Sequence, residues 1–233
     1  MNYYVFIPLT AIFINLVLVS YTFAAGRERK TTWAYMLYVG CNVVWELADV
    51  FMWSGISDEA VNLTHKIVAP FALPISFNFM NFVYTMLRRK RDLVYYSLAG
   101  CVTAGVILMV FTDLYITRDV VRLYWGISPT PGPLYMPFMV LVFVVPVLRA
   151  IYLLWRSSRA ESRPVMRTQL RLLEWGAIIM TVIAMVNAVI LPFILGIYDF
   201  PRVNSSASVV QSIFIFVVIA RYNFRVFPEC WEI

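Results

Sequence analysis

Long apolar runs alternate with short polar segments along the whole chain. Charged clusters and turn residues separate seven such runs, at about 3–25, 32–54, 66–87, 93–112, 134–155, 170–196 and 206–226. Each run is close to the roughly 20 residues that an α-helix needs to cross a bilayer, and much longer than the about 9–11 residues of a membrane strand. The pattern therefore predicts an all-α integral membrane protein, a bundle of seven transmembrane helices.

Composition strengthens this interpretation. The 233 residues are 61% hydrophobic and 14% charged, with a mean hydropathy of +0.76. One soluble core cannot bury so large an apolar fraction, so the surplus must face lipid. We expect residues 1–233 to form a single membrane domain whose first partner is the lipid bilayer of the inner (cytoplasmic) membrane of a cell.

The distribution of positive charge predicts an orientation. Of the nineteen Lys and Arg residues, only Lys66, Arg118, Arg122 and Arg202 fall on one side of the alternating chain, and all the others fall on the opposite side. The positive-inside rule makes the richer side cytoplasmic, which places the N-terminus outside and the C-terminus in the cytoplasm. Because this bias already explains the net charge of +6, we expect no nucleic acid partner.

The longest external connection, about 113–133, has a pattern of its own. Apolar and polar residues alternate from Thr117 to Ser128, and the turn sequence Pro129-Thr130-Pro131-Gly132-Pro133 follows. Alternation bounded by Pro and Gly predicts a short extracellular hairpin or lid over the bundle. An ordinary surface loop, in which Tyr124 and Trp125 anchor to the membrane, is the alternative.

Prolines interrupt several of the predicted helices. Pro70 and Pro74 lie in the third run, and Pro137, Pro146 and Pro192 lie in the fifth and sixth. Each ring removes a backbone donor and predicts a kink, which serves either packing or a hinge motion.

Two carboxylates within the second apolar run are the strongest candidates for function. Glu46 and Asp49 are three residues apart on the predicted helix, and Asn42 and Trp53 extend the same stripe. A carboxylate near the bilayer centre costs about 2.5–3.5 kcal/mol, so both should turn inward and find partners. An acid pair inside the membrane therefore predicts a functional site.

The predicted depth of the helices adds residues to this site. Asn187 of the sixth run and Ser208, Gln211 and Ser212 of the seventh are expected at the level of the acid pair, and His65 and Lys66 are close enough in depth to pair with Asp49. We predict an outward-facing pocket for a small polar or amphipathic ligand, with these candidate residues: Asn42, Trp45, Glu46, Asp49, Asn187 and Gln211. The alternative is a hydrogen-bonded network that only fixes helix packing.

Several activities lack the residues that they require. His65 is the single histidine, which excludes a bis-histidine haem, and the three cysteines (Cys41, Cys101, Cys230) show no metal-binding spacing. The three lysines lie at span ends, so the seventh helix has no lysine for a Schiff base with retinal. Neither a phosphate-binding loop nor a nucleophile motif is present. We therefore expect no metal, no cofactor and no enzyme activity.

Several short motifs follow one another in a fixed order along the chain. They are a Trp-rich second span ending in Trp53, the span from His65-Lys66 to Leu87, Tyr124-Trp125-Gly126, Pro131-Gly132-Pro133-Leu134-Tyr135, Arg167-Thr168-Gln169, Asp199-Phe200-Pro201 and Ala220-Arg221-Tyr222. Their order and spacing resemble a known group, the seven-helix amino-terminal sensor region of many bacterial and archaeal histidine kinases. The resemblance covers about residues 5–227.

The resemblance implies a receptor module that detects a signal and passes a conformational change to a cytoplasmic output domain. Only Phe227–Ile233 follows the last predicted span, without a coiled-coil linker, a phosphoacceptor histidine or ATP-binding motifs. We therefore expect a non-enzymatic sensor that relays its signal to a separate cytoplasmic or membrane partner. An accessory or scaffold subunit of a larger membrane complex is the alternative, and proton or ion translocation through the acid pair is a further one.

Overall fold

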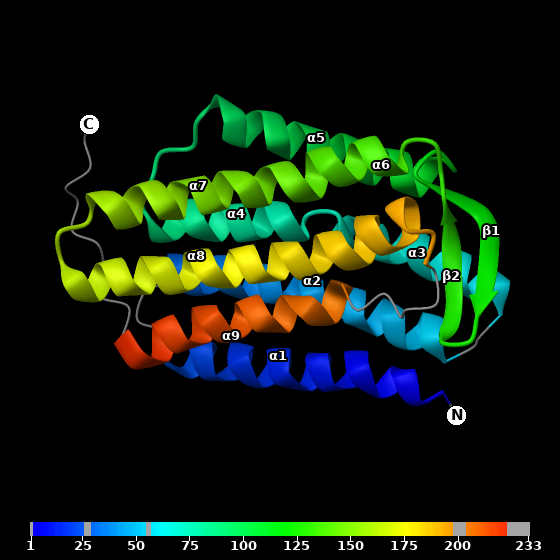
Figure 1. Ribbon diagram of the computed structural model, residues 1–233, viewed down its shortest axis with the longest axis horizontal. Helices are drawn as coiled ribbons and strands as arrows, with labels where there is room; N and C mark the ends of the chain where they lie inside the picture. The colour runs from blue at the N-terminus through cyan, green and yellow to red at the C-terminus, as the bar shows by residue number, and fades with distance from the viewer. Residues whose placement is uncertain (1, 26–28, 55–56, 198–203, 223–233) are drawn as a thin grey trace.

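Long helical rods lie side by side in the computed structural model, and a two-stranded hairpin crosses one end of the bundle (Figure 1). The structure describes residues 2–25, 29–54, 57–197 and 204–222. The motif Asp199-Phe200-Pro201, Arg202 and the segment from Asn223 onward lie outside the described residues.

The helices follow the apolar runs of the sequence. They are η1 (Tyr3–Val5, a 3-10 turn), α1 (Phe6–Ala25), α2 (Arg29–Trp53), α3 (Asp58–Ala72), α4 (Ile75–Met86), α5 (Leu93–Phe111), α6 (Tyr135–Phe138), α7 (Val145–Ala160), α8 (Pro164–Met185) and α9 (Asn204–Tyr222). Two π-helical segments, η2 (Met139–Val144) and η3 (Val186–Ile194), join α6 to α7 and extend α8. The third rod begins at Asp58, ahead of the start expected near 66, because Asp58 and Glu59 suit the positive end of a helix.

Within the described residues, five helical stretches are long and apolar enough to cross a membrane: Tyr3–Ala24, Asp58–Met86, Leu93–Phe111, Tyr135–Ala160 and Pro164–Pro192. Large apolar side chains on their outer faces are exposed, among them Phe13, Leu93 and Phe111 at 67%, 81% and 80%. Apolar surface spread over long helices of this composition is typical of contact with lipid. The chain is a helical, multi-pass membrane protein, which confirms the prediction in this form.

The two remaining rods are less apolar. α2 has 25 residues, but its polar side chains, Asn42, Glu46 and Asp49 among them, lower its hydropathy. In α9 the apolar stretch runs from Ser206 to Val218. Both helices bury most of their polar groups against neighbours, so a low hydropathy here reflects interior position.

Prolines mark the irregular places in the bundle. α3 ends at Ala72 and α4 begins at Ile75, with Pro74 between them as the N-cap of α4. Pro146 lies where η2 passes into α7, and Pro192 lies inside η3. A proline cannot donate the bond of a regular helix, so these positions favour breaks and wider turns.

The hairpin consists of β1 (Ile116–Leu123) and β2 (Gly126–Pro131), which are antiparallel and pair Val121 with Ser128 and Leu123 with Gly126. These are the strands among the described residues. The hairpin is attached to the bundle by Trp125, which is buried and packs edge-on against Trp53 at 5.9 Å between ring centroids. Asn2 reinforces this contact, since its Nδ2 donates to the carbonyls of Trp53 (3.0 Å) and Trp125 (2.5 Å).

The end of the bundle away from the hairpin is held together by charged groups. Asp92 caps α5 by accepting from the backbone N–H of Tyr95 at 3.0 Å, and it also accepts from Tyr84 at 2.9 Å and pairs with Arg149 of α7. Burial acts to raise the pKa of Asp92, but these donors outweigh it and lower the pKa. The main core lies between the two ends, where aromatic residues of α2 and α4 such as Tyr38 and Phe79 pack together.

Candidate functional site

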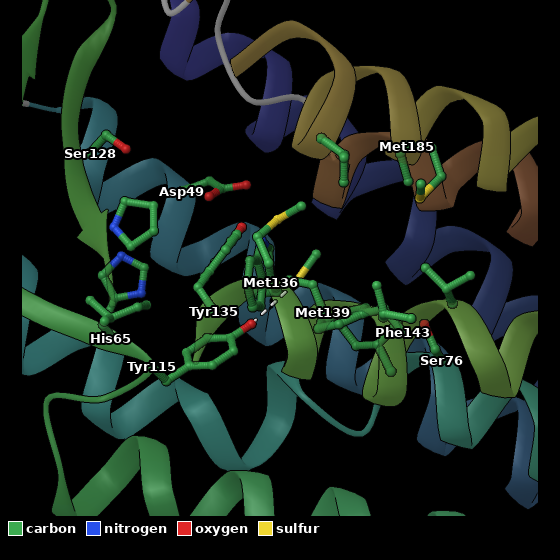
Figure 2. A pocket seen from close by; sticks show the side chains of 18 of the residues that line it. Asp49, His65, Ser76, Tyr115, Ser128, Tyr135, Met136, Met139, Phe143 and Met185 are labelled. Carbon is green, nitrogen blue, oxygen red and sulfur yellow. Dashed lines mark hydrogen bonds between the residues drawn. The ribbon is translucent and has the colours of Figure 1, made fainter. Parts of the chain in front are cut away.

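A cavity of about 180 Å³ lies beneath the hairpin, between α2, α4, the α6–α7 rod and α8 (Figure 2). Five elements contribute most of its wall: α2, the hairpin, α6, η2 and α8. An engineered cavity of about 150 Å³ in another protein holds benzene. The space here therefore fits a small organic molecule.

The wall is mostly apolar, with a few polar groups. The polar side chains that line it, apart from the tyrosines, are Asn42, Asp49, His65, Ser76, Ser128 and Thr181. Asp49 from α2 and Tyr135 from α6 both extend into the cavity (Figure 2). The Nε2 atom of His65 lies 2.9 Å from the sulfur of Met52. A largely apolar wall with a few convergent polar groups is typical of sites that bind amphipathic molecules.

Methionine is the most frequent residue type in this wall. The five that line it are Met52, Met136, Met139, Met180 and Met185. The hydroxyl of Tyr115 donates to the sulfur of Met139 at 3.2 Å (Figure 2). Because methionine side chains are unbranched and polarizable, they can repack around different shapes. The wall can therefore adapt to an occupant.

Both π-helical segments border the cavity. Met139, Val140 and Phe143 of η2 line one side, and Val189 of η3 lines another. A π-helical turn, with hydrogen bonds between residues five apart, is rare and is often found at functional sites. The π-helical segments of the described chain therefore lie next to the cavity.

The candidate residues from the sequence divide between two places. Asn42, Trp45 and Asp49 line the cavity. Glu46 and Gln211 do not, because they face the interface between α2, α1 and α9 instead. Asn187 lies in η3, where its side chain donates to the carbonyl of Ile183 at 2.9 Å and does not line the cavity.

The two possible cationic partners of Asp49 also differ in position. His65 lines the same cavity as Asp49. Lys66 forms an ion pair with Asp113 at 3.6 Å, near the start of the hairpin. The acid pair of the sequence is therefore not one site, since the two carboxyl groups face different neighbours.

Sequence reasoning missed the aromatic and sulfur-containing part of the wall. Tyr115, Tyr135, Met136, Met139 and Met185 lie in apolar segments whose hydropathy does not distinguish a side chain facing a cavity from one facing lipid. The dense aromatic and proline sequence from Gly132 to Phe138 is the one signal that marks this region as irregular.

A separate polar cluster occupies the interface of α1, α2 and α9. The Nδ2 of Asn15 donates to Oε1 of Glu46 at 2.9 Å, and the hydroxyl of Tyr38 donates to Oε1 of Gln211 at 3.1 Å. Glu46, Asn15 and Gln211 are each at most 1% exposed. Ser208 also belongs to this buried cluster.

Within the described part of the chain, no group of three His, Cys, Asp or Glu side chains comes together. Cys41 is buried and accepts a hydrogen bond from Nδ2 of Asn78 at 3.2 Å. Its thiol therefore belongs to the packing of α2 against α4.

Comparison of the chain with protein-family models, with curated proteins and with solved structures finds no match.

Proposed function

We propose that this protein is a membrane receptor whose cavity beneath the hairpin binds a small amphipathic molecule, and that binding changes the packing of the helices that reach the cytoplasm. The observation that carries the proposal is the cavity itself. It is lined by five methionines and by the carboxylate of Asp49. An interior that served packing alone would be filled more completely.

The proposed ligand has a flat or compact apolar body and one polar or cationic group. Aromatic and methionine side chains contact the apolar body, while Asp49, Asn42 and Ser128 are placed to meet the polar group. The volume of about 180 Å³ limits the ligand to a molecule not much larger than a substituted benzene ring.

The proposed signal travels along α8. Met180, Thr181 and Met185 of this helix line the cavity, and its first turns, with Arg167 and Arg171, lie at the end of the bundle away from the hairpin. A ligand shifts an equilibrium only when it binds one packing state more tightly than the other. We propose that ligand contacts with η2 and η3 provide this difference and that a separate cytoplasmic protein receives the change, in line with the resemblance to sensor regions.

We further propose seven membrane crossings, with the N-terminus and the hairpin outside. The one-sided distribution of Lys and Arg supports this orientation. In a cysteine-free background, Asp119→Cys should react with a membrane-impermeant maleimide on intact cells, and Ser162→Cys should react only after permeabilisation. The reverse pattern would contradict the orientation.

Ligand binding can be tested with a variant that fills the cavity. Ala184 lines it, so Ala184→Phe should occupy the binding space, whereas Ala104→Phe adds the same ring to an exposed position on α5. Thermal unfolding in detergent is measured with a panel of small aromatic amines, alcohols and quinones. At least one compound should stabilise the parent and Ala104→Phe but not Ala184→Phe. A panel without any stabilising compound, or equal stabilisation of all three proteins, contradicts the receptor proposal and favours the accessory-subunit hypothesis.

A further inference from the structure

Buried polar atoms without a hydrogen-bond partner gather at one interface. In the described chain there are seven such side-chain atoms: Asn15 Oδ1, Tyr35 OH, Glu46 Oε2, Ser206 Oγ, Ser208 Oγ, Gln211 Nε2 and Ser212 Oγ. All of them belong to α1, α2 or α9. An unpaired buried polar atom destabilises the folded state, so a group of them at one place indicates that something else completes their hydrogen bonds or coordination.

Glu46 is at the centre of this cluster. One carboxyl oxygen accepts from Nδ2 of Asn15 at 2.9 Å, while the other, Oε2, has no partner. The hydroxyl of Ser208 lies beside the carboxyl without completing a hydrogen bond. Glu46 and Asn15 are 0% exposed and Ser208 is 1% exposed, so bulk water does not reach them.

The charge of Glu46 is not balanced by the protein. Glu46 forms no ion pair in the described part of the chain, and its hydrogen bond comes from a neutral amide. Asp49, the nearest other carboxylate on α2, faces the cavity and adds charge of the same sign. A carboxylate in such a place is stable only with a positive partner or with a bound proton.

We infer that a Na⁺ ion binds between α1, α2 and α9, coordinated by Oε2 of Glu46, Oδ1 of Asn15 and Oγ of Ser208. All three are hard oxygen ligands, which suit a hard cation. One carboxylate neutralises one positive charge, so the site takes a monovalent ion. The three ligands are at most 1% exposed, and so enclosed a site favours Na⁺, the smaller of the two abundant monovalent cations, over K⁺.

Protonation of Glu46 is the main competing explanation. A proton on Oε2 removes the charge and lets this oxygen donate to one neighbouring oxygen, which leaves the third oxygen without a partner. A cation contacts the three oxygens at the same time. The ion site is distinct from the cavity beneath the hairpin and does not depend on the receptor proposal.

The experiment measures thermal unfolding of the full chain in detergent at mildly alkaline pH. NaCl is compared with KCl and with choline chloride at equal ionic strength. Because a ligand that binds only the folded state raises its stability, saturating Na⁺ should raise the unfolding midpoint by about 5 °C above the other salts. Equal midpoints in the three salts, or a larger rise in K⁺, would overturn the inference and indicate buried water or a proton.

Three variants locate the site. Glu46→Gln should abolish the Na⁺-specific rise, and Ser208→Ala, which removes one neutral ligand, should shift the Na⁺ concentration needed for it upward by roughly tenfold. Glu59→Gln is the matched control, since it makes the same change at an exposed carboxylate of α3 and should keep the full response. A Na⁺-specific rise that persists in Glu46→Gln, or that disappears in Glu59→Gln alone, contradicts the proposed ligands.

Discussion

At the residue scale, the role of a polar side chain in this protein depends on which neighbouring element the side chain faces. Glu46 and Asp49 are three positions apart, which on a helix separates their directions by about 60°. Since α2 is surrounded by other elements, this angle is enough to direct Asp49 into the cavity and Glu46 towards α1. The sequence predicts that both are buried, but it cannot predict that they face different neighbours.

Gly126 is a residue whose replacement should disturb the hairpin. Its φ is +152°, and a Cβ atom there would lie 2.9 Å from the carbonyl oxygen of Met52 and 2.9 Å from the Cα of Trp53. We expect Gly126→Ala to destabilise the protein by about 1–3 kcal/mol, seen as a lower thermal unfolding midpoint in detergent. Gly100→Ala is the control, because a Cβ at this helical position meets no atom within 4 Å. It should be neutral or slightly stabilising, and equal loss in both variants would refute the close contact.

Glu161 makes stability depend on pH. Both of its carboxyl oxygens accept from Arg163, at 2.9 and 3.0 Å, and the hydrogen bonds from Arg163 lower the pKa of Glu161 despite its burial. A lowered pKa in the folded state means that the carboxylate contributes stability above its unfolded pKa and that this contribution is lost as the pH falls through the folded value.

We therefore expect Glu161→Gln to reduce the free energy of unfolding by about 1–2 kcal/mol at neutral pH. The difference between the parent and the variant should shrink as the pH falls below the ordinary pKa of a glutamate and disappear once the carboxyl is protonated in the folded state. Thermal unfolding of both proteins across this range provides the measurement. A difference that stays constant with pH would show that the ion pair does not contribute.

At the element scale, the hairpin and the two π-helical segments define the site. The alternation between Thr117 and Ser128 predicts strands, and the structure has β1 and β2 there. The same pattern does not predict that Trp125 turns inward, because a turn residue is equally compatible with a membrane surface. The prolines predict irregular helices, but neither they nor the hydrophobic periodicity predicts that the irregular segments are the π-helical turns η2 and η3.

Trp125 should determine how firmly the hairpin closes the bundle. It is 2% exposed and packs against Trp53, so Trp125→Ala removes most of the apolar contact that holds the hairpin. Loss of a buried Trp costs about 3 kcal/mol or more, which corresponds to a rise of about a hundredfold in the open population. Limited trypsin cleavage at Arg118 and Arg122 should accelerate accordingly.

Val121→Ala is the control for this measurement. Val121 lies in the same hairpin but is 48% exposed, so its truncation should leave the cleavage rate nearly unchanged. If both variants are cleaved at the rate of the parent, Trp125 does not anchor the hairpin.

At the scale of the whole molecule, the two ends of the bundle have different chemistry. Ion pairs occur at both ends, such as Lys66–Asp113 near the hairpin and Arg149–Asp92 at the opposite end, but the cavity rich in sulfur and aromatic rings lies at the hairpin end. Hydropathy predicts the helical membrane protein because every segment that crosses lipid must be long, apolar and hydrogen-bonded within itself. Hydropathy does not predict a cavity, because a cavity forms where segments distant in the sequence leave space between them.

The claim on which the proposed function depends is that a small molecule occupies the cavity beneath the hairpin, and oxidation of methionine tests it directly. Mild oxidation of the detergent-solubilised protein, followed by peptide mass spectrometry, is measured with and without a compound that stabilises it. Oxidation of Met136, Met139 and Met185 should fall several-fold in the presence of the compound, while that of Met36, a partly exposed residue remote from the cavity, should not change. Unchanged oxidation at the three cavity methionines, or protection at Met36 alone, would contradict the claim.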